Sequence, residues 1–190
     1  MKVFIATFLC FFICFGFLAS AEQNPYAVIS VSNPEIKVLS SNIFSWSDKS
    51  RYVYDDERLG GFPLKEKFEN DIKTYLAENG YVFSKNEDNA SMVVGYVIAL
   101  ESSLNDLDIN SLYGINPGYI NKDKNKAGNQ YEKGTIIIDM LEARTNRHIW
   151  RGAIQGMAEF GISDKERETR LKSAVDTLLS EFIKIYGRGK

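Results

Sequence analysis

His148 is the single histidine of this 190-residue chain and therefore the first residue to test for chemistry. An imidazole can act as a general base or bind a metal ion, but each role needs further groups beside it. Any Ser–His–Asp triad would have to use His148, and no serine lies in a Gly-x-Ser-x-Gly motif. We interpret His148 as a strand residue at the base of a hairpin and predict no catalytic residue.

Acidic side chains suggest a calcium site as a second candidate. Asp106, Asp108 and Asn110 are spaced as in the first part of a calcium-binding loop. The glycine that such a loop needs does not follow at the right spacing, and Pro117 stands where its bidentate glutamate would be. Both cysteines lie in the apolar N-terminal run, so the rest of the chain has no thiolate ligand. We predict no metal site and no cofactor.

Charged groups of opposite sign meet in a predicted hairpin. Asp139 and Glu142 lie close in sequence to three arginines, Arg144, Arg147 and Arg151. Paired carboxylates can perform acid–base catalysis. Carboxylates beside arginines on a hairpin are more typical of cross-strand or surface ion pairs, each worth under about 1 kcal/mol, and we expect that role here.

The predicted binding residues come mainly from a long polar segment, residues 101–133. The segment is rich in Asn, Asp, Lys and Gly, and a loop of this length in a compact domain is usually functional or mobile. Tyrosine among glycine and polar residues suits recognition. Trp150 lies on a predicted strand after this segment. We interpret it primarily as a core residue, with a role as a binding platform as the alternative. The candidate binding residues are Leu112, Tyr113, Tyr119, Ile120, Trp150 and Arg151.

Hydrophobic periodicity defines the elements that would position these residues. Period-two or continuous apolar patterns predict strands over residues 27–32, 43–47, 92–100, 134–142 and 148–158, with loops over 48–63 and 101–133. Apolar residues three and four apart predict a helix over 64–79, and a capping box at Ser163–Glu166 begins a second helix of about 20 residues. The order ββαβ–loop–ββα predicts an α+β fold, in which about five strands form a mixed or antiparallel sheet and two long helices cover one face.

The N-terminus predicts export. Residues 1–21 comprise one lysine, an apolar run and the small-x-small sequence Ala19-Ser20-Ala21, which is the order of a cleavable signal peptide. A retained anchor is the alternative, but the run is slightly short of the about 20 residues that span a bilayer and has no basic flank. We therefore predict one domain over residues 22–190, located in the periplasm or at the outer membrane of a Gram-negative bacterium, with no stable anchor after cleavage.

Charge excludes one class of partner. The formal net charge of the chain is −2. Nucleic-acid binding requires a basic patch, so we expect no nucleic-acid partner.

Three stretches of the sequence resemble the DUF4136 family of bacterial envelope proteins. They are Phe44–Trp46, the helix end Leu76–Tyr81, and the hairpin from Gly134 through Trp150-Arg151-Gly152. The resemblance covers nearly all of residues 22–190, with Asn146 where the family turn often has glycine and with 101–133 as an apparent insertion. Many family members are lipoproteins, whereas neither Cys10 nor Cys14 follows the small residue that lipidation needs. The function of the family is undefined.

Three functional hypotheses follow. The first is a non-enzymatic envelope protein that uses the 101–133 segment and the sheet edge to bind another macromolecule, most simply an envelope protein. The second is a carrier of a lipid or small apolar ligand, which requires a sizeable apolar cavity between helices and sheet. The third is a hydrolase that depends on His148.

Overall fold

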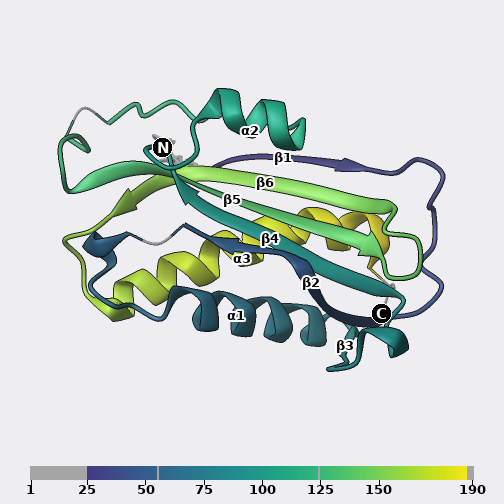
Figure 1. Cartoon of the computed structure of the whole chain (residues 1–190). Coiled ribbons are helices and arrows are strands. Elements are labelled where there is room, and N and C mark those ends of the chain that lie inside the picture. The colour runs from purple at the N-terminus through teal and green to yellow at the C-terminus, as the bar shows by residue number, and fades with distance from the viewer. Residues whose placement is uncertain (1–24, 55, 124, 188–190) are drawn as a thin grey trace, which may run out of the picture.

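The computed structural model describes residues 25–54, 56–123 and 125–187 of the chain, so the predicted signal peptide at 1–21 lies outside the described residues. Within these ranges the chain forms an α+β fold (Figure 1). The strands are β1 (Ala27–Ser32), β2 (Ile43–Val53), β3 (Val82–Phe83), β4 (Met92–Leu100), β5 (Tyr131–Glu142) and β6 (His148–Glu159). The helices are α1 (Leu64–Glu78), α2 (Asp106–Tyr113) and α3 (Asp164–Tyr186), and the 3-10 turns are Glu57–Leu59 and Glu87–Asn89.

The six described strands form one mixed sheet in the order β1-β6-β5-β4-β2-β3. β2 is parallel to both β4 and β3, while β4, β5, β6 and β1 pair antiparallel. Parallel neighbours need a long crossover, which α1 supplies between β2 and β3. The prediction of a mixed sheet covered by two long helices is confirmed, although β3 adds a sixth strand and α2 a third helix.

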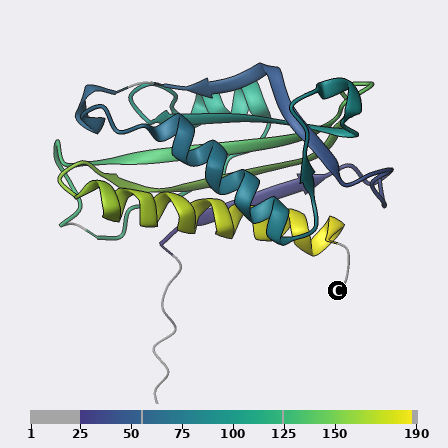
Figure 2. The ribbon, with the colours of Figure 1, turned by 90° about the horizontal axis from the view of Figure 1, so that it is seen from below.

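The main core lies between the sheet and the two long helices. α1 contributes Phe68, Ile72 and Leu76, which are fully buried and follow the predicted helical spacing. α3 contributes Val175 and Phe182 among its buried residues. Figure 2 shows α1 and α3 on the same face of the sheet, where they cross at an angle in this view. Lys67 of α1 and Glu168 of α3 form an ion pair between the first turns of the two helices, with Nζ 2.7 Å from Oε1.

Two predicted loops contain regular structure. β2 continues to Val53, because after an irregularity between Trp46 and Arg51 the strand pairs again with β4. The polar residues at this irregularity hide the strand from a periodicity argument. The segment 101–133 contains α2, which Asn105 caps at its start and Gly114 ends in the left-handed conformation. The prediction that 48–53 and 106–113 are loop is therefore wrong.

Candidate ligand-binding site

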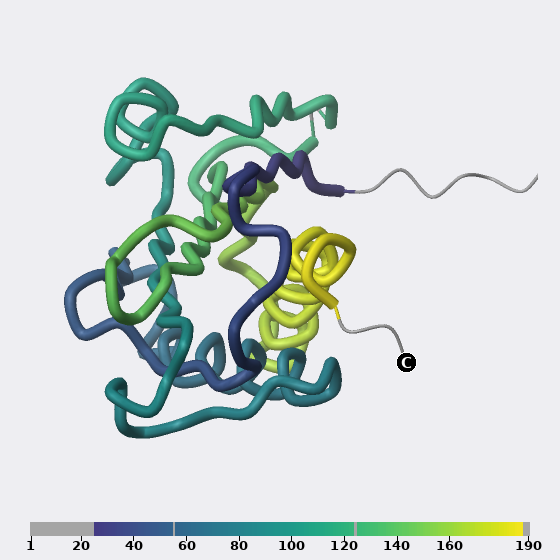
Figure 3. Tube along the Cα trace, turned by 90° about the vertical axis from the view of Figure 1, so that its right-hand side faces the viewer, coloured from purple at the N-terminus to yellow at the C-terminus, as the bar shows by residue number. Residues whose placement is uncertain are grey.

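The segment from residue 101 to residue 130, named the α2 segment below, covers the sheet face opposite α1 and α3. Figure 3 shows it on the far side of the sheet from the two long helices. A second, smaller core forms there, and Ile109 of α2 is fully buried in it. Sheet residues Val97, Ile137 and Ala153 supply its floor. The predicted binding segment is therefore a layer of the fold.

A buried amide holds this layer to the sheet. The Gln155 side chain is fully buried, and its Nε2 donates to Asp106 Oδ1 at 2.9 Å and to Thr135 Oγ1 at 3.1 Å. Its Oε1 accepts from the backbone N–H of Tyr119 at 3.0 Å. Lys133 Nζ lies 2.8 Å from Asp106 Oδ2. Burial alone would raise the pKa of Asp106, but the hydrogen bonds from Lys133 and Gln155 outweigh it and lower the pKa.

Two of the predicted binding residues meet on this face. Arg151 Nη1 donates to the backbone carbonyl of Tyr113, and the guanidinium lies 5.5 Å from the centre of the Tyr113 ring. Arg151 also forms a cross-strand ion pair with Asp139, with Nη2 2.8 Å from Oδ2, as the hairpin pattern predicts. His148 Nδ1 is 3.9 Å from Asp139 Oδ1. Arg151 is thus bonded within the protein.

The other four predicted binding residues are dispersed. Leu112 and Ile120 are 66% and 74% exposed. Tyr119 is half-buried and lines the pocket described next. Trp150 is 1% exposed and lies in the main core, where its ring is 5.6 Å from that of Phe182. The core interpretation of Trp150 therefore describes its position, and its ring offers no surface platform.

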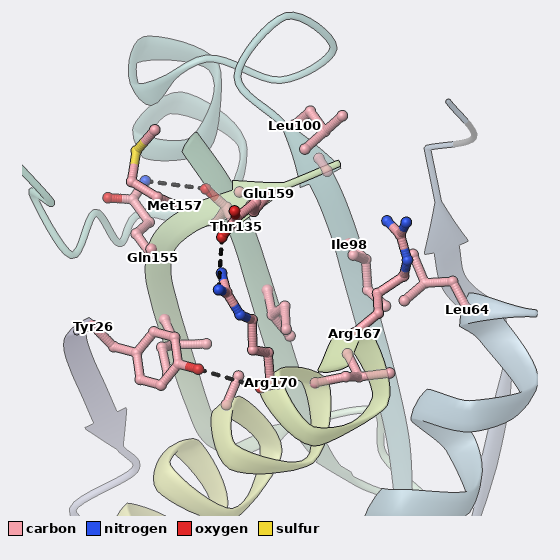
Figure 4. Close-up of a pocket in the computed structure, with 18 of the residues that line it drawn as sticks. Tyr26, Leu64, Ile98, Leu100, Thr135, Gln155, Met157, Glu159, Arg167 and Arg170 are labelled. Atoms are coloured by element: carbon pink, nitrogen blue, oxygen red, sulfur yellow. Dashed lines mark hydrogen bonds and ion pairs between the residues drawn. The ribbon is translucent and has the colours of Figure 1, made fainter. Parts of the chain in front are cut away.

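A cavity of about 400 Å³ lies between the sheet, the start of α1 and the first turns of α3. Its floor is formed by Ile98, Ile136 and Ile154, which are register partners on three adjacent strands. Figure 4 shows Ile98 and the residues around the cavity. Its walls include Leu64 at the start of α1 and Leu171 on α3. We call this cavity the helix-side pocket. It is partly open to solvent, and most of its lining is apolar.

Side-chain size explains why the cavity lies at this end. Toward the helix C-termini, rings fill the core between sheet and helices, and they belong to Tyr81, Trp150, Phe182 and Tyr186. At the helix N-termini the sheet instead presents isoleucines, and α3 presents Ala174. Close-packed interiors leave few voids of this size, so the small residues here leave real space.

Two arginines of α3 border the helix-side pocket. Arg170 Nη2 lies 2.6 Å from Glu159 Oε2, and Glu159 also accepts from Tyr131 Oη at 3.0 Å. Arg167 is bonded differently. Its Nη2 donates to the carbonyls of Phe160 and Ile162 at 3.2 and 3.4 Å, and its Nε is buried with no hydrogen-bond partner among the described residues.

The lining combines an apolar surface with a few charged groups at its border. It contains no histidine, cysteine or serine among the residues that the structure describes. Nor do any three His, Cys, Asp or Glu side chains of the described ranges lie together as metal ligands would. An apolar cavity with a few polar groups at its border is typical of a small-molecule site. No local sequence signal indicates this site, because its lining residues come from several segments of the chain.

No helix in the described part of the chain has both the length and the apolar character needed to cross a bilayer.

Comparison with known proteins shows the family. Residues 33–182 match the sequence model of the family described as Domain of unknown function (DUF4136). A DUF4136 family protein from Bacteroides thetaiotaomicron is similar in structure, with a TM-score of 0.55 and 13% identity, over 87% of this chain and 100% of that one. PelC from Paraburkholderia phytofirmans, solved as a dodecamer, gives a TM-score of 0.50 and 11% identity over 86% and 99% of the two chains. No curated protein matches the sequence. The chain therefore belongs to the DUF4136 family.

Proposed function

We propose that this protein binds a small apolar molecule in the helix-side pocket and carries it without chemical change. The observation that supports the proposal is the cavity of about 400 Å³ between the sheet and the N-terminal halves of α1 and α3. Its volume falls in the range of about 300–1,000 Å³ that small-molecule sites occupy. The carrier hypothesis requires such a cavity, whereas a solid core would argue against it.

The energetics of the lining support an apolar ligand. Transfer of apolar surface from water to an apolar site is worth roughly 25 cal/mol per Å². The floor of Ile98, Ile136 and Ile154 gives such a ligand contact on one side, and Phe62, Leu64 and Leu171 on others. The signal-peptide pattern at residues 1–21 fits an exported carrier, and cleavage would leave the protein free of its apolar N-terminal run.

Binding of a fluorescent apolar probe tests the proposal. N-phenyl-1-naphthylamine should bind the protein saturably at one site, with a fluorescence increase on transfer from water. Ala174→Phe places a ring in the pocket and should weaken probe binding at least tenfold, because Ala174 lines the cavity. Ser173→Phe is the matched control, since Ser173 is the exposed neighbour on the same helix. Thermal unfolding of both variants verifies folding, and a wild-type protein that binds no probe would refute the proposal.

Exposed apolar residues on the α2 segment favour a second candidate, binding of another envelope protein. Leu107, Leu112 and Ile120 are 81%, 66% and 74% exposed although they belong to an ordered layer. Single exposed apolar side chains are common, but three on one segment suit recognition. This candidate is compatible with the first, because these side chains lie outside the helix-side pocket.

Crosslinking in intact cells tests the second candidate, binding of another envelope protein through the α2 segment. Deleting the α2 segment would uncover the smaller core, so point variants are the better probe. Leu112→Asp combined with Ile120→Asp should abolish a crosslinked partner, whereas Val38→Asp, at an 83% exposed residue elsewhere, should leave it intact. A partner that is retained by the double variant would exclude this surface.

A further inference from the structure

We infer that the ligand of the helix-side pocket is an amphiphile with one carboxylate head group, and that Arg167 binds this head group. The inference rests on the proposed function, because it names the chemical class of the molecule that the pocket takes. It is carried by the difference between the two arginines that border the cavity, Arg167 and Arg170.

Arg170 is already neutralised within the protein. Its Nη2 lies 2.6 Å from Glu159 Oε2, and its side chain is 46% exposed. Glu159 also accepts from Tyr131, so its second oxygen is engaged. A ligand anion at Arg170 would have to compete with this carboxylate.

Arg167 has no ion pair at hydrogen-bond distance among the described residues. Its side chain is only 14% exposed, and the carboxylate paired with it, Asp164, lies 3.8 Å away and is 75% exposed. That separation is beyond hydrogen-bond distance. Its two contacts to carbonyls are long, and Nε has no partner among the described residues. The guanidinium also lies 5.5 Å from the centre of the Phe62 ring. A largely desolvated cation with an unused Nε donor is stabilised further by an anion that accepts from it.

The position of Arg167 suits a head-group site. Figure 4 shows its guanidinium on the α1 side of the pocket, beside Ile98 and Leu64, while Arg170 turns toward Glu159 on the other side. The isoleucine floor extends from Ile98 through Ile136 toward Ile154. A carboxylate at Arg167 therefore lies at one border of an apolar surface along which a hydrocarbon chain packs.

A carboxylate matches this site better than a phosphate monoester does. The planar fork of one guanidinium pairs with both oxygens of a carboxylate. A doubly charged phosphate would call for a second free cation. Of the other two cations that line the pocket, Arg170 is paired with Glu159. Lys126 comes from the α2 segment, on the opposite side of the sheet from the helix that carries Arg167 (Figure 3). The chemistry thus points to a fatty-acid-like ligand.

Probe displacement by three amphiphiles of equal chain length tests the inference: dodecanoic acid, 1-dodecanol and dodecyl phosphate. Wild-type protein should bind the acid about tenfold or more tightly than the alcohol, which is the ratio expected for one charge-assisted hydrogen-bonded contact. The phosphate should bind no more tightly than the acid. Tighter binding of the phosphate would overturn the assignment of a carboxylate.

Variants at the two arginines locate the head group. Arg167→Gln should weaken dodecanoic acid binding about tenfold and leave dodecanol binding unchanged, and Arg167→Lys should recover part of the loss. The matched control is Arg170→Gln combined with Glu159→Gln, which removes the ion pair without leaving an unpaired carboxylate and should leave the preference for acid over alcohol intact. Dodecanol binding and thermal unfolding report whether each variant is folded.

The outcomes separate this inference from the proposed function. Equal binding of acid and alcohol by the wild type, or an unchanged preference in Arg167→Gln, overturns the head-group assignment but keeps the pocket as an apolar site. No binding of any amphiphile and none of the naphthylamine probe overturns both.

Discussion

At the scale of single residues, Gly152 sets how closely α3 approaches the sheet. A Cβ built on Gly152 would lie 2.2 Å from Cη2 of Trp150 and 2.8 Å from Cδ1 of Leu178 on α3. Such distances require the ring or the helix to move. Glycine in a strand often marks a bulge or this kind of close approach, and at Gly152 the approach is that of α3.

Gly152→Ala should destabilise the protein by about 1–3 kcal/mol, because overpacking of a close-packed core strains its neighbours. Gly134→Ala is a fair control on the adjacent strand, since the atom nearest to an added methyl group there would be the Ala158 Cβ at an ordinary 3.6 Å. Urea unfolding measures both free energies. Equal stability of the two variants would show that the Trp150 ring yields without strain.

Residue-level predictions from sequence succeeded where the deciding partner is close in sequence. The ion pair of Asp139 with Arg151 follows from a hairpin that aligns them, and the structure confirms it. Trp150 shows the limit of such reasoning. Its neighbour Arg151 faces the α2 segment, so alternation along the strand places the Trp150 ring on the helix face, in the main core. The main core forms on the sheet face that α1 and α3 cover, and the residues of the strand alone do not indicate which face that is.

At the scale of elements, the two long helices were predictable because their signals are local. α1 and α3 each have an apolar stripe, and α3 has the Ser163–Glu166 capping box that the sequence indicated. α2 has one buried residue, Ile109, and therefore no stripe to detect. The second half of β2 depends on pairing with Tyr96–Ile98 of β4, which no local pattern reveals.

The cap of α2 should determine how firmly this short helix is formed. Asn105 accepts hydrogen bonds from the backbone N–H groups of Leu107 and Asp108 at 2.9 and 3.1 Å. Asn105→Ala should destabilise the helix by about 0.5–2 kcal/mol, because these donors lose their side-chain acceptor. Amide hydrogen exchange of residues 107–113 should become faster while that of β4 and β5 is unchanged.

Asn110→Ala provides the control for this prediction. Asn110 is exposed within the same helix, and alanine has the higher helix propensity. In the Asn110→Ala variant, the amides of residues 107–113 should therefore exchange no faster than in the wild type. Faster exchange in Asn110→Ala, or no faster exchange in Asn105→Ala, would show that contacts of Ile109 alone fix α2.

At the scale of the whole molecule, the sheet separates two cores of different character. The helix side holds the larger core and the helix-side pocket, while the α2 side holds the smaller core and the buried polar group around Gln155. The order of elements allowed the helix layer to be predicted from sequence. The pocket was not predictable, because segments far apart in sequence border it: Pro25 and Tyr26, the start of α1, and the end of β6 with the first turns of α3.

The polar group around Gln155 should make the stability of the molecule depend on acid. Hydrogen bonds from Lys133 and Gln155 hold the pKa of Asp106 below its ordinary value of 3.8, despite the opposing effect of burial. A carboxylate with a lowered folded-state pKa contributes stability above its unfolded-state pKa and loses that contribution as the pH falls through the lowered value. The wild type should therefore be less stable at pH 3 than at pH 6, partly through Asp106.

Urea unfolding at pH 6 and pH 3 measures the contribution of Asp106. Asp106→Asn should lower stability at pH 6 and reduce the difference between the two pH values, because the variant has no carboxylate to protonate. Asp88→Asn, at an exposed residue of the 3-10 turn Glu87–Asn89, should keep the wild-type difference. If Asp106→Asn keeps it as well, other carboxylates govern the acid response. The α2 segment would then be held to the sheet mainly by Ile109 and Ile115 in the smaller core.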